Sequence, residues 1–393
     1  DGTLATVQSG GAGDAGTVGL TGLTRVEVGN TTFLLGASGS DNALISYRLT
    51  GNGTPQEVDR ISAEDGVGIG GASAVRVIEV GGQSYAILAA SGSGSLSVAA
   101  IGDDGTLILT DHVMDTLDTR FAGVHEIEVV AHAGRAYVAV AGADDGVTLF
   151  EMLPGGRLRH MGTVADALDT TLEAVSALSL AVQGDALYLG VTSSVEAGLT
   201  LFTIDLGAMA APLLGGSGAE TLTGGSGDDL IQGGAGNDRL LGGAGDDVIL
   251  DGAGADEMWG GDGADVFILS GDDATNTIRD FDITEDSLDL SDWPLLRATS
   301  QLTFGNRNDG IIIRFNGQEL VVRTANGQSL DPEDILALDL IGQSRFLPDW
   351  VLPVDGTDPD PDPDPDPDPD PDPDDPTGSL NLVGTDARDT LVG

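Results

Sequence analysis

The chain has 393 residues and a formal net charge of −48, because 64 Asp and Glu residues face only 16 basic ones. Such a polyanion repels nucleic acid and anionic membrane surfaces, so neither is an expected partner without a bridging cation. The chain has no cysteine, which excludes disulfides, thiolate metal sites and cysteine nucleophiles. No apolar run is long enough to span a membrane. Since 40% of the residues are hydrophobic, we expect a folded chain and not a disordered polymer.

Residues 1–210 contain an internal repeat with a period of about 52 residues. Its clearest markers are four aromatic residues at this spacing, Phe33, Tyr85, Tyr137 and Tyr188. Short stretches that alternate apolar and polar residues are separated by Gly, Asp and Asn turns, which is typical of strands joined by hairpins. Four strands in a unit of this length indicate a propeller blade. We therefore expect an all-β fold in which residues 1–210 form a β-propeller with four recognisable blades.

The first residues of the chain bear on how this propeller closes. Asp1-Gly2-Thr3-Leu4 matches Asp104-Gly105-Thr106-Leu107, which opens the outer strand of a blade. The fourth repeat stops near Gly207 after three strands, so an N-terminal strand could complete the last blade of a four-bladed ring. Alternatively, the four units are blades of a larger ring whose beginning is absent.

A second repeat, nine residues long, occupies residues 215–268 six times. It follows the pattern G-G-x-G-x-D-x-U-x, where U is apolar. Glycine permits positive φ angles and brings carbonyl oxygens close to one point, and the carboxylate at position six adds a hard oxygen ligand that suits Ca²⁺. Two nonapeptides make one turn of a parallel β-roll, so repeats n and n+2 stack. The apolar residue at position eight then points inward.

The predicted calcium ligands come from positions two, four and six of the nonapeptides. The acidic residues are Glu220, Asp229, Asp238, Asp247, Asp256 and Asp265, and the glycines are Gly216, Gly218, Gly225, Gly227, Gly234, Gly236, Gly243 and Gly245. One ion between each pair of stacked turns gives about four Ca²⁺ sites, with room for a fifth or sixth at the ends. Glu220 departs from the pattern and is predicted to bind weakly. Asp251 replaces the first glycine of the fifth repeat and is expected to strain that turn slightly.

These six consecutive copies resemble the RTX (repeats-in-toxin, haemolysin-type calcium-binding) family. The stretch from Gly271 to Phe281, followed by Glu285-Asp286 and residues 288–291, also resembles the segment after RTX arrays. The resemblance implies export by a type I system in an unfolded, calcium-poor state and folding on calcium outside the cell. The expected location is therefore extracellular or at the cell surface.

The remaining segments complete the predicted organisation. Residues 269–353 should form a β-rich cap that follows the roll, with a hairpin at Asn316-Gly317 and a short helix between Pro332 and Leu340. Residues 354–377 should form an extended linker, because residues 358–376 within them are almost strictly Pro-Asp. Residues 378–393 look like the start of a further RTX-like array.

Several weaker signals have ordinary interpretations. The GxGxxG matches that begin at Gly11 and Gly66 do not join a strand to a helix, so they do not indicate a nucleotide site. His125 and His132 do not form a HExxH motif and are interpreted as strand residues. The acidic loops 115–118 and 166–169 recur 51 residues apart. They could hold a calcium ion or ligand at the propeller rim, but a solvated loop is the favoured interpretation.

Two functions are consistent with this organisation. The favoured one is a calcium-binding structural or adhesive surface protein, whose propeller mediates self-assembly or binds an extracellular ligand. The alternative is a secreted, lactonase-like propeller hydrolase that carries an RTX export and folding module. The hydrolase requires acidic or histidine side chains to converge at one mouth of the propeller. We predict no catalytic residue, and an enzyme is the less favoured hypothesis.

Overall fold

The computed structural model describes residues 19–51, 54–168, 170–207, 209–342 and 345, all within one compact unit of the chain. The described part is all-β apart from one short α-helix and two 3-10 helices. None of its helices has the length and apolar character needed to cross a membrane. The predicted N-terminal closing strand, the Pro-Asp linker and the further RTX-like array lie outside the described residues.

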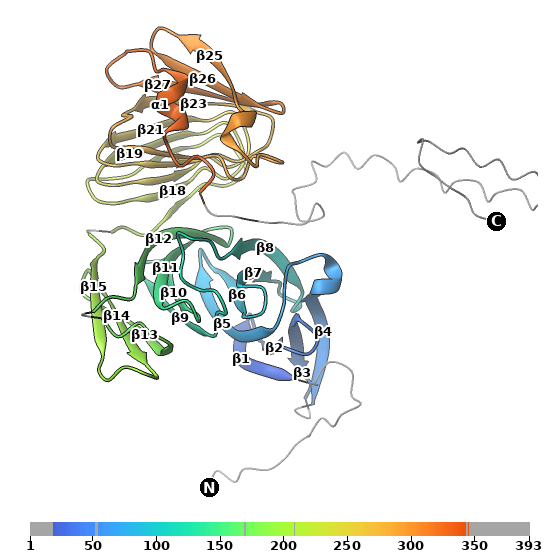
Figure 1. The fold of residues 1–393 in the computed structure, drawn as a ribbon. Helices are drawn as coiled ribbons and strands as arrows, with labels where there is room; N and C mark the ends of the chain where they lie inside the picture. Colours follow the sequence, from blue (N-terminus) through green and yellow to red (C-terminus); the bar gives the residue numbers. More distant parts are fainter. Residues whose placement is uncertain (1–18, 52–53, 169, 208, 343–344, 346–393) are drawn as a thin grey trace, which may run out of the picture. The chain divides into compact units, whose positions relative to one another are not determined.

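Residues 20–205 form four antiparallel sheets, and each strand pairs with the next along the chain (Figure 1). Sheet 1 contains β1 (Leu20–Val28), β2 (Thr31–Ser38), β3 (Ala43–Leu49) and β4 (Pro55–Ser62). Sheet 2 contains β5 (Ala72–Val80), β6 (Gln83–Ala90), β7 (Ser95–Ile101) and β8 (Leu107–Met114). Sheet 3 contains β9 (Glu126–His132), β10 (Arg135–Ala141), β11 (Gly146–Leu153) and β12 (Arg157–Ala165). Sheet 4 has three described strands, β13 (Val175–Gln183), β14 (Ala186–Ser193) and β15 (Thr200–Asp205).

The four sheets share one register. The repeated aromatic residues of the second strands pair with the first strands in the same way: Phe33 with Val26, Tyr85 with Ile78, Tyr137 with Val130 and Tyr188 with Ala181. The sequence repeat therefore places equivalent residues at equivalent positions, and a residue can be compared with its counterparts in the other sheets.

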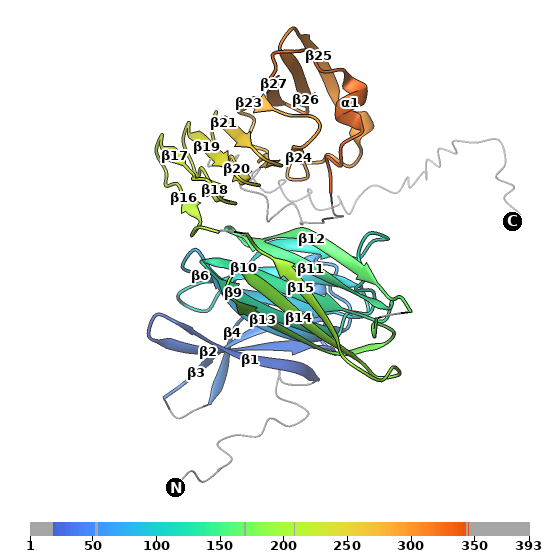
Figure 2. The same cartoon turned by 90° about the vertical axis from the view of Figure 1, so that its left-hand side faces the viewer.

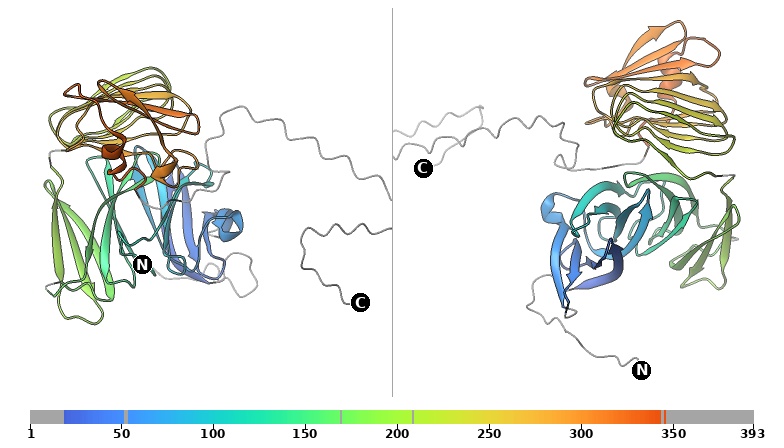
Figure 3. Two further views of the ribbon diagram at one scale, coloured as in Figure 1. Left: turned by 45° about the horizontal axis from the view of Figure 1, so that its top comes forward. Right: turned by 180° about the vertical axis from the view of Figure 1, so that it is seen from behind.

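Successive sheets pack face to face through three apolar cores. The first core joins sheets 1 and 2, the second joins sheets 2 and 3, and the third joins sheets 3 and 4. The first strands of neighbouring sheets lie side by side, in the order β1, β5, β9, β13 (Figure 1). Figure 3 shows the four sheets, coloured from blue to green, in two further views. Burial of these faces is the dominant stabilising term for such an assembly. The four sheets are successive blades of a β-propeller, as the repeat predicts.

Residues 213–289 form a parallel β-roll of two facing sheets, whose strands follow one another from left to right in Figure 2. The first sheet contains β16 (Leu213–Leu214), β18 (Leu230–Gln232), β20 (Val248–Leu250), β22 (Val266–Ile268) and β24 (Ser287–Asp289). The second contains β17 (Thr221–Thr223), β19 (Arg239–Ala244), β21 (Glu257–Asp262) and β23 (Thr275–Phe281). Strands two repeats apart pair in parallel, as the nonapeptide pattern predicts.

The interior of the roll is a single file of apolar side chains. Position eight of the nonapeptides supplies them, and the fully buried ones are Ile231, Leu240, Ile249, Met258 and Phe267. They belong to one continuous cluster that extends into the cap. Because the strands of the roll are only two to seven residues long, this core is thin, and the rest of each nonapeptide turn consists of glycine-rich loop.

The cap continues the second sheet of the roll with three more strands. β27 (Gln318–Thr324) pairs in parallel with β23, and β26 (Gly310–Phe315) and β25 (Thr303–Arg307) follow as antiparallel neighbours. Asn316 and Gly317 have φ angles of 45° and 92°, which suit a two-residue hairpin turn and confirm the predicted hairpin. Helix α1 spans Pro332–Leu336, at the beginning of the predicted helical stretch.

Candidate calcium sites

The position-six carboxylates lie in two buried rows, one on each side of the roll. In each row, Oδ1 accepts a hydrogen bond from the backbone N–H of the position-six residue 18 residues earlier. These bonds run from Glu220 to Asp238 (2.7 Å), from Asp229 to Asp247 (2.8 Å), from Asp238 to Asp256 (2.7 Å) and from Asp247 to Asp265 (2.9 Å). Each stacked turn is therefore fixed to the next by one carboxylate oxygen.

The second oxygen of these carboxylates has no such partner. Oδ2 of Asp238, Asp247, Asp256 and Asp265 is buried and accepts no hydrogen bond, and the four side chains are almost completely inaccessible to solvent. A buried charged oxygen without a partner is strongly unfavourable, and proteins avoid it by adding a proton or a cation. This repeated row of open oxygen atoms fits a cation of the kind that the sequence predicts.

The raised pKa values of three of these aspartates also favour a bound cation. Burial raises the pKa of Asp247 to about 7, and the neighbouring carboxylates Asp265 and Asp229 add to the increase. Burial likewise raises the pKa of Asp256 and of Asp265 to about 6, and nearby carboxylates contribute in both cases. Among the described residues, no basic side chain is a cause of these pKa shifts. The rows are thus built for a positive charge that the chain itself does not supply.

The glycines of the turns are required by close stacking. Gly243 has a φ of 121°, and a Cβ atom there would lie 2.2 Å from the carbonyl oxygen of Gly225 in the turn before. Any other residue would therefore push the two turns apart. Of the eight predicted glycines, the later four have positive φ: Gly234, Gly236, Gly243 and Gly245.

The glycines of the first two repeats differ from this prediction. Gly216, Gly218, Gly225 and Gly227 are not among the positive-φ residues. Their repeats begin the roll, so no nonapeptide turn lies before them against which their backbone must pack. The acidic residues of these two repeats differ from each other. Oε2 of Glu220 has no partner, whereas Oδ2 of Asp229 accepts from the Gly225 N–H.

Two residues of the cap continue the rows beyond the nonapeptides. Asn276 Oδ1 accepts from the Asp256 N–H at 2.8 Å, and Asp286 Oδ1 accepts from the Asp265 N–H at 3.0 Å. Their separations in sequence are 20 and 21 residues, not 18. Asp280 Oδ1 accepts from the N–H of Gly260, which also lies beside Asp265 Oδ2. Sequence reasoning missed these positions because the repeat loses its period there.

Asp251, which was expected to strain its turn, instead has a full set of partners. Its side chain is almost fully buried. Oδ1 accepts from the N–H groups of Gly252 and Ser270 at 2.7 and 2.8 Å, and Oδ2 accepts from Asn276 Nδ2 at 2.7 Å. Burial raises its pKa well above the usual value. The aspartate therefore connects the fifth repeat to the cap through side-chain hydrogen bonds that a glycine could not make.

The acidic loops of the propeller carry a different arrangement. Asp115 Oδ1 accepts from Thr119 Oγ1 and from the Phe121 N–H at 2.7 and 3.1 Å. Asp166 Oδ1 makes the equivalent bonds with Thr170 and Leu172, both at 3.1 Å. In both loops the first aspartate closes its own turn. Within the described ranges, no three His, Cys, Asp or Glu side chains gather in a way that could hold a metal.

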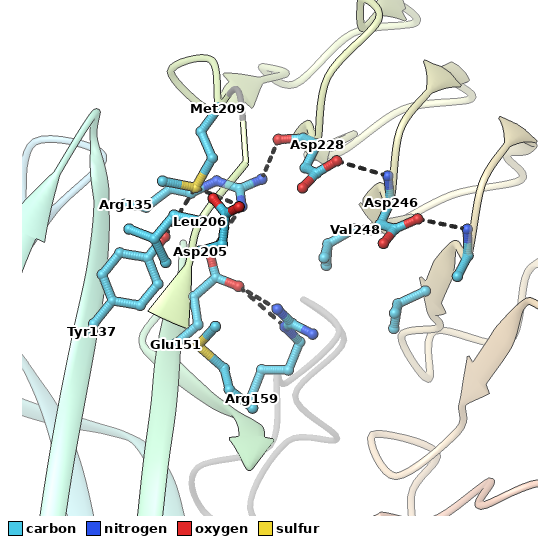
Figure 4. A pocket seen from close by; sticks show the side chains of 13 residues that line it. Arg135, Tyr137, Glu151, Arg159, Asp205, Leu206, Met209, Asp228, Asp246 and Val248 are labelled. Carbon is cyan, nitrogen blue, oxygen red and sulfur yellow. Dashed lines mark hydrogen bonds and ion pairs between the residues drawn. The ribbon is translucent and has the colours of Figure 1, made fainter. Parts of the chain in front are cut away.

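A cavity of about 270 Å³ is lined by strands β10 to β12, by residues after β15 and by turns of the roll (Figure 4). Glu151 accepts from Arg159 at 2.8 Å and lies 3.4 Å from Arg135. Arg135 also donates to the Asp228 carbonyl at 3.1 Å. Burial and the nearby Glu151 raise the pKa of Tyr137 to about 12. The two arginines of the cavity are thus engaged by acceptors of the chain itself.

Comparison with known proteins identifies the nonapeptides. Residues 214–249 and 241–275 match the family of RTX calcium-binding nonapeptide repeats. This segment therefore consists of RTX repeats, and Ca²⁺ is the ion implied by them. A search of the curated proteins found no relative.

Solved structures resemble the chain only in part. A subunit of the mannuronan C5-epimerase of Azotobacter vinelandii is 24% identical, covers 34% of this chain and 91% of its own, and has a TM-score of 0.24. A putative exo-β-1,3-galactanase of Bifidobacterium bifidum is 17% identical, with coverages of 48% and 68% and a TM-score of 0.33. A protein of Lactobacillus plantarum is 17% identical, with coverages of 43% and 53% and a TM-score of 0.31. At these scores the likenesses carry no argument about function.

Proposed function

We propose that this chain, which joins RTX calcium-binding repeats to four propeller blades, is an extracellular structural or adhesive protein whose roll folds on Ca²⁺. One observation carries the proposal. Four buried carboxylate oxygens, one each on Asp238, Asp247, Asp256 and Asp265, have no partner among the residues that the structure describes, and they recur at a fixed spacing. Hard oxygen atoms in this number and burial favour Ca²⁺.

The ligands we assign follow from this arrangement. Each ion would use the open oxygen of one position-six carboxylate and backbone carbonyl oxygens of the glycine turns stacked beside it. About four ions fill the four open positions, and each supplies two positive charges that offset the neighbouring carboxylates. Glu220 and Asp229 bound the array at its start, where the turns depart from the repeated geometry.

The location outside the cell is supported by the composition of the chain. A chain with a net charge of −48 and no cysteine stays soluble and free of crosslinks while unfolded. Millimolar calcium outside the cell would then stabilise the folded roll, because ligand binding to the native state adds to its stability. We propose type I export, which the likeness to RTX proteins implies.

The propeller would act as the binding or assembly module. Its two acidic loops close on their own aspartates and place Leu117 and Leu168 at fully exposed tips. The outer sheets expose further apolar side chains, among them Leu23 of β1 and Leu201 of β15. Exposed apolar groups of this kind are typical of surfaces that contact a partner.

The calcium assignment is tested on the full chain with the Asp238→Ala/Asp247→Ala variant, which removes one ligand from each row. We expect calorimetry to show fewer bound Ca²⁺ ions and a weaker affinity than in the original chain. Asp262→Ala is the matched control, because Asp262 is an exposed acid of the same repeats and should leave binding unchanged. Equal binding of Mg²⁺, or no loss in the double variant, would contradict the assignment.

A further inference from the structure

A repeated hydrogen bond connects each propeller sheet to the next. In sheet 1, Thr21 Oγ1 donates to the carbonyl of Ala72 in sheet 2 at 2.6 Å. In sheet 2, Ser73 Oγ donates to the carbonyl of Val124, which precedes β9 of sheet 3, at 2.7 Å. Donors and acceptors therefore recur at the period of the sequence repeat. Each sheet offers an acceptor to the sheet before it and a donor to the sheet after it.

The third junction uses the same positions. His125 Nε2 lies 3.0 Å from the carbonyl of Val175 at the start of sheet 4. The residue that follows, Ser176, occupies the donor position of sheet 4. Thus the series predicts a contact from Ser176 to a further sheet.

Ser176 makes only half of this contact. Thr21 and Ser73 each also donate to a carbonyl of their own sheet 16 residues later, at 3.2 and 3.1 Å. Ser176 Oγ makes the same internal bond, to the carbonyl of Thr192 at 3.2 Å. In the described residues, however, no carbonyl of a following sheet reaches Ser176. The donor side of sheet 4 is complete within the sheet and lacks a neighbour beyond it.

The same face of sheet 4 exposes apolar residues that the other sheets bury. Leu199 and Leu201 are 64% and 58% exposed. Their counterparts in sheet 3, Val147 and Leu149, are 2% and 8% exposed and pack in the core against sheet 4. We call the surface of Ser176, Leu199 and Leu201 the forward face of sheet 4.

The opposite end of the array shows the complementary surface. Leu20 and Leu23 of β1 are 37% and 60% exposed. Their counterparts in sheet 2, Ala72 and Val75, are each 1% exposed, because the core with sheet 1 covers them. The carbonyl of Leu20 has the sequence position of the Ala72 acceptor. We call the surface of Leu20 and Leu23 the back face of sheet 1.

We propose that the forward face of sheet 4 binds the back face of sheet 1 of a second copy of this chain. Each face carries what the other lacks: an inter-sheet donor and apolar side chains on one, the matching acceptor and apolar side chains on the other. The chain uses this contact three times internally, so a fourth contact continues an existing interface. Sheet 1 of the same chain does not provide it, since Leu20 and Leu23 stay exposed.

The contact has a defined symmetry. Two different surfaces meet, so the association is head-to-tail: two copies close a ring if both contacts form, and otherwise copies add in an open series. The inference rests on the assembly role proposed above but does not depend on the roll. Its failure would leave calcium binding untouched, and the two can be measured separately on the same samples.

Sedimentation of the full chain in millimolar Ca²⁺ tests the association. We expect a dimer, or growth of the mass with protein concentration, for the original chain. Leu201→Arg and Leu23→Arg place a charge in the two faces and should both give a monomer with an unchanged circular dichroism spectrum. Ile108→Arg is the control, because Ile108 is an exposed apolar residue of β8 in the same propeller and should not alter the mass. A monomer at every concentration for the original chain would overturn the proposal.

Crosslinking distinguishes a second copy from closure within one chain. Leu149 and Leu178 meet in the core between sheets 3 and 4, and Leu201 and Leu23 are their counterparts. The chain has no cysteine, so Leu201→Cys on one tagged chain and Leu23→Cys on another can react only across the proposed contact. We expect a covalent dimer carrying both tags on treatment with a short bis-maleimide. If the two cysteines placed together in one chain react only internally, the contact is intramolecular and the proposal is wrong.

Discussion

The propeller and the roll bury carboxylates in opposite ways. In the propeller, Glu151 is fully buried and faces Arg159 and Arg135, and Asp111 is buried against Arg345 at 3.2 Å. In the roll, Asp247 lies between Asp229 and Asp265, two repeats away on either side; burial raises its pKa, and these two carboxylates add to the increase. Both propeller acids are therefore neutralised by arginines: Glu151 by two arginines of its own sheet, and Asp111 by Arg345, which lies outside the propeller. The roll leaves that charge to an ion from solution.

This difference separates the stability of the two regions. Apolar cores between the propeller sheets need no cation, because their stabilisation comes from surface removed from water. The roll has a single file of apolar residues and two rows of aspartates, so its folded state gains stability only as the rows are neutralised. We therefore propose that the propeller folds on its own contacts, whereas calcium controls the folding of the roll.

The largest expected effect is the response to chelation. Removing Ca²⁺ from the full chain should abolish protection from hydrogen exchange in β17 to β22, whereas β5 to β11 should remain protected. The reason is that like charges then repel along both rows of the roll, while the propeller cores are unchanged. Hydrogen exchange with mass spectrometry, before and after chelator, measures both regions in one sample. Equal loss of protection in both would refute the distinction.

An intermediate effect should come from neutralising one buried acid in each region. Glu151→Gln leaves Arg135 and Arg159 without their partner and should destabilise the propeller by about 3–5 kcal/mol, with or without calcium. Asp247→Asn removes a repelling charge, so the roll should be more stable than the original in chelator and less stable in calcium. Thermal unfolding in chelator and in calcium measures whether the stability rises in the first condition and falls in the second. If Asp247→Asn is destabilising in chelator as well, repulsion between the carboxylates does not limit the stability of the calcium-free roll.

The smallest expected effect is a pH dependence within the propeller. His112 is buried with Nδ1 2.9 Å from Ser97 Oγ, and its burial lowers its pKa below the usual 6.5, although Asp111 opposes the shift. Its neutral form is favoured in the folded state. The stabilisation of the folded state by neutral His112 is complete above pH 6.5 and is lost as the pH falls below that value.

Hydrogen exchange of β8 checks this prediction. Protection should decrease between pH 7 and pH 5.5 more steeply in the original chain than in His112→Gln, after correction for the intrinsic exchange rate. His132→Gln is the control, since that histidine lies at the end of β9 and should leave the slope unchanged. Identical slopes for all three chains would show that His112 does not contribute.

The two repeats made most of the fold predictable. Alternation within the 52-residue unit and the fixed nonapeptide pattern are local signals, and both structures build each turn or blade from neighbouring residues. The position-six acids could be named for the same reason. Asn276 and Asp286 could not, because they continue the rows after 20 and 21 residues, where the cap replaces the turn. The hydrogen bonds of Asp251 could not be predicted either, because its partners Ser270 and Asn276 lie after the nonapeptides, the second of them in β23.

By itself, the sequence determined which residues repeat, and hence that the chain is all-β, that one part is a calcium-binding roll and that aspartates fill its sixth positions. Only the tertiary structure decided which carboxylate oxygens are open, which acids meet an arginine, and which sheet faces lack a neighbour. The physical reason is that periodicity reports the environment common to all copies of a repeat. The partner of a particular residue, such as Ser176 at the end of the propeller, depends on which copies stand beside it.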